Sequence, residues 1–218
     1  MRFPNAAKGV SRIFLAEILA LIASVVMFIA TFMGILTFAA NETGAANGVI
    51  GAGIGMLGFL TAAGFLGIIS FILNIVGIVN ASKDEESFRS ALMCTVVGII
   101  VSVIGSIFSA NVFVYDICGI ISRLMSLIVT VLVILGIIRL ADRLHNAAVS
   151  ANGRMQLKLI VAIYCVSIIA SIVVAFLGGQ AASTVAGIVA IVSAVLSIVQ
   201  YILYLIFLSK AKKMLENS

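Results

Sequence analysis

The chain has 218 residues, of which 63% are hydrophobic and 10% are charged, and its formal net charge is +5. Soluble globular proteins carry about 25% charged residues, so this composition excludes that class. The chain is instead expected to be an all-α polytopic integral membrane protein. Once six membrane spans are assigned, too few residues remain for a soluble domain of ordinary size, so residues 1–218 are expected to form a single transmembrane domain.

Six long apolar segments follow one another along the chain. They cover residues 13–40, 48–79, 91–110, 117–138, 159–177 and 182–208. A transmembrane helix needs about 20 apolar residues to cross about 30 Å of hydrocarbon, and each segment is close to that length or longer. The only proline of the sequence, Pro4, precedes all six segments, so none of the predicted helices carries a proline kink.

The first, third and fifth segments share a weak repeat. Around Ser24, Ser102 and Ser171 the sequence reads LIASVV, IIVSVI and IIASIV, and small or polar residues recur around these serines at heptad spacing. This pattern predicts three repeated helical hairpins. The alternative is that apolar helices built from few residue types align by chance.

Basic residues lie at every second break between the apolar segments. Twelve of the thirteen form four clusters: Arg2, Lys8 and Arg12; Lys83 and Arg89; Arg139, Arg143, Arg154 and Lys158; and Lys210, Lys212 and Lys213. Lys and Arg are retained on the cytoplasmic side of membrane helices, which predicts six spans with both termini in the cytoplasm. The same clusters are expected to contact anionic lipids of the inner leaflet, and a nucleic-acid partner is not expected.

Small residues form a stripe along the segment 48–79 and a shorter one along 182–208. Their spacing alternates between 3 and 4, which keeps them on one helix face. The stripes consist of Gly44, Gly48, Gly51, Gly55, Gly58 and Ala62, and of Ala186, Ala190, Ser193 and Ser197. Helices in lipid associate through close backbone packing, so both stripes are expected to be packing seams. The alternative is that they line a narrow pathway or bind another subunit, either a partner membrane protein or a second copy of the chain.

Arg123 is the one basic residue outside the clusters, and it is predicted to lie about six residues inside the outer edge of the fourth helix. A long side chain at this depth can reach outward to the headgroups or to Asp116, which lies two turns earlier on the same face. Charges within a membrane span are costly and often functional. The alternative for Arg123 and Asp116 is therefore a site for an anionic ligand or a lipid headgroup.

Glu17 is predicted to lie near the inner surface of the first helix, where Lys8 or Arg12 is the expected partner. The alternative for this carboxylate is an ion or proton site. Asn74 and Gln200 lie near the inner ends of their spans. Amide side chains in lipid are expected to form hydrogen bonds between helices.

The sequence carries none of the residue combinations that typify catalytic or metal sites. His145 is the only histidine, no acidic pair occupies neighbouring spans at one depth, and the three cysteines form no CxxC motif. Nucleophile–histidine pairs, carboxylate dyads and zinc sites all need such combinations. No enzymatic activity, metal or cofactor is therefore expected.

Two functions remain. The first is a small transport component, such as a solute-binding subunit, a small carrier or a channel subunit. The second is a non-transporting protein that acts through small-residue helix contacts, such as an assembly, regulatory or immunity-type partner. The two differ in whether the polar and small stripes surround a hydrated cavity or are used up in helix packing.

The charge distribution generates a topology prediction. A reporter domain is expected to be external when fused in the connections without basic residues and cytoplasmic when fused beside the basic clusters. The external positions are Asn47, Tyr115 and Gln180, and the cytoplasmic positions are Glu85, Asn152 and Ser218. A paired phosphatase and fluorescent-protein assay measures this, and an external signal at Glu85 or Asn152 would contradict the six-span topology.

Overall fold

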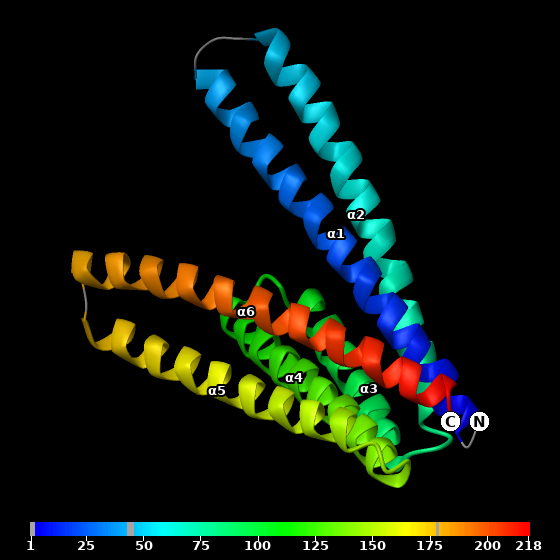
Figure 1. Ribbon diagram of the computed structural model, residues 1–218. Coiled ribbons are helices and arrows are strands. Elements are labelled where there is room, and N and C mark those ends of the chain that lie inside the picture. Colours follow the sequence, from blue (N-terminus) through cyan, green and yellow to red (C-terminus); the bar gives the residue numbers. More distant parts are fainter. Residues whose placement is uncertain (1–2, 43–45, 178) are drawn as a thin grey trace. The chain divides into compact units, whose positions relative to one another are not determined.

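The computed structural model describes residues 3–42, 46–177 and 179–218, with side chains left out over 36–54, 112, 165, 167–191 and 193–194. Within these residues the fold consists of six α-helices, with no strand (Figure 1). The helices are α1 (Pro4–Glu42), α2 (Ala46–Ala81), α3 (Glu86–Ile107), α4 (Val112–Arg143), α5 (Ala147–Leu177) and α6 (Gly179–Glu216). The expected all-helical fold is confirmed.

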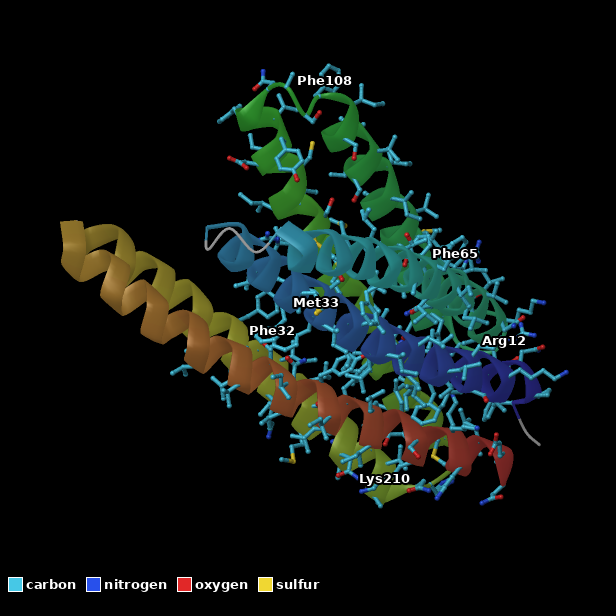
Figure 2. All side chains as sticks on the ribbon, turned by 90° about the horizontal axis from the view of Figure 1, so that it is seen from above. Arg12, Phe32, Met33, Phe65, Phe108 and Lys210 are labelled. Atoms are coloured by element: carbon cyan, nitrogen blue, oxygen red, sulfur yellow. The ribbon has the colours of Figure 1, made fainter. Side chains whose placement is uncertain are left out.

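Five stretches among the described residues are long and apolar enough to cross a membrane. They are Pro4–Ile35, Gly55–Ala81, Glu86–Ile107, Phe113–Arg143 and Val195–Glu216. Large apolar side chains also cover the outside of the helices: Phe32, Phe65 and Phe108 are each more than half exposed (Figure 2). Large exposed apolar surfaces are rare on soluble monomers but suit contact with lipid. The structure is therefore that of a polytopic helical membrane protein.

Most helices extend beyond the predicted spans. Four extensions are made of residues before 13, after 138, before 159 and after 208, where polar residues continue the helix without a breaker. Pro4 occupies the first position of α1, where its missing N–H and fixed φ do no harm. The connection 108–111 is shorter than predicted because Asn111 caps α4, its side chain accepting a hydrogen bond from Val114 N at 3.3 Å.

The chain divides into two compact units, each described by itself. Ser11–Gly77 forms the hairpin unit, made of most of α1 and α2, and Met1–Val10 with Ile78–Ser218 forms the four-helix unit. In the four-helix unit α3 packs against α4, α4 against α5, and α5 against α6. We call the end of this unit that holds residues 3–10, 82–85, 144–146 and 209–218 the basal end, and the opposite end the distal end. The sequence predicts that the basal end faces the cytoplasm.

In the hairpin unit, small residues of α1 bring α2 close. A Cβ atom added at Gly34 would lie 3.1 Å from Met56 Sδ. One end of the seam is polar, because the buried Ser70 hydroxyl donates a 2.8 Å hydrogen bond to the carbonyl oxygen of Ala16. Lipid offers no hydrophobic gain between helices, so such backbone approach and interhelical hydrogen bonds hold the hairpin together.

In the four-helix unit, α3 meets α4 along small residues at heptad spacing. A Cβ atom at Gly98 would lie 3.3 Å from Met125 Cβ, and one at Gly105 would lie 2.8 Å from Cys118 Cβ. Between them the Ser102 and Ser122 hydroxyls are 3.0 Å apart and share a hydrogen bond. Two residues of the small and polar stripe predicted around Ser102, Gly98 and Ser102 itself, thus lie in the contact between α3 and α4.

At the basal end, a buried carboxylate joins the α2–α3 connection to α4. The Glu85 side chain is 1% exposed, and its two oxygens lie 3.4 Å from Arg139 Nη1 and 3.0 Å from Arg143 Nη2. The two arginine side chains are 58% and 53% exposed, so the acid is buried while its bases reach solvent. Removing one partner of such an ion pair destabilises the protein strongly when the charge that remains is buried.

The neighbouring carboxylate, Asp84, caps the start of α1. Its oxygens accept hydrogen bonds from Ala6 N at 2.7 Å and from Asn5 Nδ2 at 3.0 Å. The first N–H groups of a helix have no partner within the helix, and a carboxylate there also opposes the positive end of the helix dipole. Residues nearly 80 positions apart in sequence are thereby joined.

The α3–α4 seam generates a stability prediction. Gly105→Ala is expected to destabilise the protein by about 1–3 kcal/mol, because the new methyl group overlaps Cys118 and the two backbones must separate. Gly119→Ala is the matched control, since nothing lies within 4 Å of a Cβ atom at Gly119. Unfolding in mixed micelles measures both variants. Equal stability of the two variants would contradict this helix contact.

The basal ion pairs generate a second prediction. Glu85→Gln is expected to cost about 1–2 kcal/mol, because both arginines remain solvated. Arg139→Gln with Arg143→Gln is expected to cost about 3–5 kcal/mol, because it leaves a buried carboxylate without a cation. Adding Glu85→Gln to that double variant should recover part of the lost stability, because it removes the unpaired buried charge. If the double variant were unstable only because two charges that set the membrane topology are missing, Glu85→Gln would not restore stability.

The exposed Glu86→Gln is the control for this series. Its effect is expected to stay below about 1 kcal/mol, since its interaction is with the start of α3. The variant with all three substitutions, Glu85→Gln, Arg139→Gln and Arg143→Gln, should be more stable than the double arginine variant. Equal stability of the two would contradict the idea that the buried Glu85 charge causes the loss.

Candidate functional site

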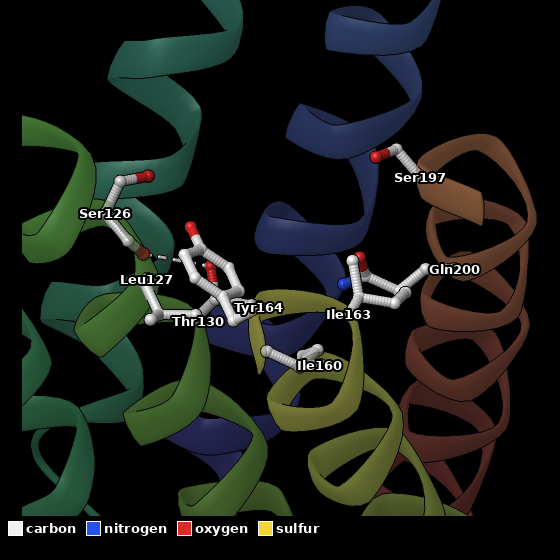
Figure 3. A pocket seen from close by; sticks show the side chains of 8 residues that line it. All are labelled: Ser126, Leu127, Thr130, Ile160, Ile163, Tyr164, Ser197 and Gln200. Atoms are coloured by element: carbon white, nitrogen blue, oxygen red, sulfur yellow. Dashed lines mark hydrogen bonds between the residues drawn. The ribbon is translucent and has the colours of Figure 1, made fainter. Parts of the chain in front are cut away.

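A cavity of about 420 Å³, open along part of its surface, lies between three helices of the four-helix unit (Figure 3). Its lining comes from Ser126, Leu127 and Thr130 of α4, from Ile160, Ile163 and Tyr164 of α5, and from Ser197 and Gln200 of α6. Sites for small molecules usually measure about 300–1,000 Å³ and combine apolar walls with a few polar groups. The cavity matches this description in both size and lining.

The helix period explains why these residues meet. On each helix the lining residues are one, three or four positions apart, which places them on one face. The register between the helices is set nearer the basal end, where a Cβ atom at Gly153 of α5 would lie 3.1 Å from Phe207 of α6. From that contact α5 and α6 run antiparallel, so Tyr164 reaches the level of Ser197 and Gln200.

The polar lining groups can donate and accept hydrogen bonds but carry no charge. Thr130 Oγ1 donates to the Ser126 carbonyl at 3.0 Å, and its oxygen can still accept. Tyr164 and Gln200 form no hydrogen bond within the described part of the chain. A phenol and an amide inside a membrane protein are stable when water or a ligand supplies the missing partner.

The structure places Arg123 and Asp116 outside this lining. Both side chains are exposed on α4, and they form no ion pair with each other. Arg123 lies four residues before Leu127, one turn toward the distal end on the cavity face of the helix. An anion or headgroup site at Arg123 stays a prediction.

Glu17 belongs to the hairpin unit and is not among the residues that line the cavity. Asn74 Nδ2 of α2 donates to Glu17 Oε1 of α1 at 3.5 Å. This is the interhelical hydrogen bond expected of Asn74, made with an acid whose predicted partners were Lys8 or Arg12. The ion or proton site at Glu17 stays a prediction.

The predicted small-residue stripes are described only in part. Gly44 lies outside the described residues, as do the surroundings of Gly48, Gly51, Ala186, Ala190 and Ser193. A Cβ atom at Gly55 would lie 3.7 Å from Met33 Cε, one at Gly58 has nothing within 4 Å, and Ala62 is exposed. Ser197, the last residue of the α6 stripe, lines the cavity. The packing role of the α2 stripe therefore stays a prediction.

Two polar lining residues, Ser126 and Thr130, were not singled out from the sequence. They are four residues apart in an otherwise apolar segment, which is a signal for one polar face. A similar residue, Gln156, precedes the predicted fifth span and is buried in the structure. Among the described residues no group of His, Cys, Asp and Glu side chains could hold a metal ion.

No protein-family model, curated protein or solved structure matches the chain. The functional assignment therefore depends on the chemistry of the cavity.

Proposed function

We propose that the protein is a transport component that binds an uncharged, hydrogen-bonding solute between α4, α5 and α6. The observation that carries this proposal is the cavity of about 420 Å³, where three helices place five polar side chains together. Polar groups inside a membrane are costly and concentrate where they face a partner or a water-filled path. A cluster of this kind supports a solute-binding role.

The lining supports an uncharged solute. Hydroxyl and amide groups can match the donors and acceptors of a neutral polar molecule, and Leu127, Ile160 and Ile163 can contact its apolar parts. A charged solute would lose its hydration without gaining a counter-charge, because no lining residue carries one. Polyols, amides and neutral heterocycles fit this requirement, and carboxylates and amines do not.

A second candidate is a protein that acts through helix contacts. It is favoured by α2, where Cβ atoms at Gly58, Gly64 and Gly67 would meet nothing within 4 Å. Gly64 and Gly67 are three positions apart and share one face of α2, and glycines on one face allow another helix backbone to approach closely. The partner would be a membrane helix of another protein or of a second copy.

The solute proposal is tested by thermal stability in detergent with a panel of neutral and charged small molecules. Neutral hydrogen-bonding members are expected to raise the melting temperature, and charged members of equal size are not. Gln200→Leu or Tyr164→Phe should weaken binding about fivefold or more, which corresponds to one lost hydrogen bond of about 1 kcal/mol.

Ser106→Ala is the matched control, because its hydroxyl is exposed and bonds to the Ser102 carbonyl of its own helix. Native mass spectrometry of the gently solubilised protein shows whether a solute copurifies. If the small molecules shift the melting temperature of the wild type and of Gln200→Leu equally, this would contradict binding in this cavity and favour the helix-contact alternative.

A further inference from the structure

Nearer the basal end than the cavity, α4, α5 and α6 are tightly packed through apolar side chains, which we call the basal closure. Gly153 of α5 is wedged between Ile138 of α4 and Phe207 of α6, and no room remains there for a Cβ atom. Ile138, Phe207 and Leu208 are all nearly or fully buried. A passage from the cavity to the basal end would have to separate these residues.

One buried polar residue lies between this closure and the cavity on the same face of α5. Gln156 lies on α5 between Gly153 and the cavity residue Ile160. Along the helix axis it lies about 4.5 Å on the distal side of Gly153 and about 6 Å on the basal side of Ile160. Its residue is 6% exposed, and its Oε1 atom is buried without a hydrogen-bond partner. A buried amide oxygen without a partner retains the full cost of its lost hydration.

We propose that Gln156 makes the basal closure a gate, an inference that rests on the proposed transport function. The closed packing leaves the amide oxygen without a partner, and separation of the helices admits water that hydrates it. The unpaired oxygen therefore raises the free energy of the closed state toward that of the open state. An apolar residue of the same length, such as Met, would occupy the same space without an unpaired oxygen. It would therefore lower the free energy of the closed state relative to the open state.

The tight fit around Gly153 gives the gate two distinct states. Close-packed helices separate or close but do not yield gradually, because a small gap already forfeits much of the dispersion attraction. Gln156 affects the balance between these states from its place beside the closure, and the cavity groups Tyr164 and Gln200 hold the solute beyond it. Binding and gating are therefore assigned to different residues of one face.

The gate is tested by the access of water-soluble reagents to the cavity. Ser126→Cys is introduced into a chain whose native Cys94, Cys118 and Cys165 are replaced by alanine. A membrane-impermeant cationic methanethiosulfonate is applied from either side in right-side-out and inside-out vesicles. With Gln156→Met, labelling from the basal side is expected to slow about tenfold, and the melting temperature is expected to rise.

Asn152→Met is the matched control. It removes an amide one turn nearer the basal end on the same helix, at a position that is only partly buried. It should leave the labelling rate unchanged. Gln156→Leu is a second apolar variant and should act in the same direction as Gln156→Met.

The outcomes separate the two proposals. Ser126→Cys that does not react from either side would overturn the hydrated cavity and with it the proposed function. Labelling from the basal side at equal rates in Gln156→Met and its parent would overturn the gate alone. Labelling from the distal side alone, or a lower melting temperature with faster basal labelling in Gln156→Met, would also overturn the gate.

Discussion

Close contact between backbones is the constraint on which this fold depends, because an apolar side chain gains nothing by leaving lipid for another helix. The helices meet where small residues allow it: Gly34 beside Met56, Gly105 beside Cys118, and Gly153 between Ile138 and Phe207. Each contact also sets the register of a helix pair. The level at which polar residues of α4, α5 and α6 coincide is a consequence of this register, and so is the cavity they surround.

Polar interactions perform a different task at the basal end, where the connections are short. Glu85 joins the α2–α3 connection to α4, and Asp84 caps α1 from the next position. Both carboxylates lie beside the point where α3 begins, so a single connection orients three helix ends. Because Glu85 is buried while Arg139 and Arg143 are exposed, the cluster presents positive charge at its surface. This suits the contact with water and anionic headgroups that the charge pattern of the sequence predicts.

The number and order of the helices could be predicted because apolar length and basic clusters are local properties of the chain. The cavity could not be predicted in the same way. Periodicity showed that Ser197 and Gln200 share a face, but which face of α5 they meet depends on the contact between Gly153 and Phe207, 54 residues apart. Glu17 and Asn74 were likewise each singled out, yet their hydrogen bond needed the hairpin register. Arg123 stood out by its charge, and its relation to the cavity face appears only with the assembled helices.

Hydroxyl groups inside a span are weak evidence for a pathway, because a helix can satisfy them itself. Ser24, Thr31 and Thr95 each donate to the carbonyl oxygen four residues earlier. Tyr164 and Gln200 differ, because a phenol or a long amide does not make this local bond to its own helix. Neither side chain has a hydrogen-bond partner in the described part of the chain. The same holds for the buried oxygen of Gln156. Tyr164 and Gln200 line the cavity, and Gln156 lies on α5 nearer the basal end. Under the proposed function, a solute or water would complete the hydrogen bonds of these three side chains.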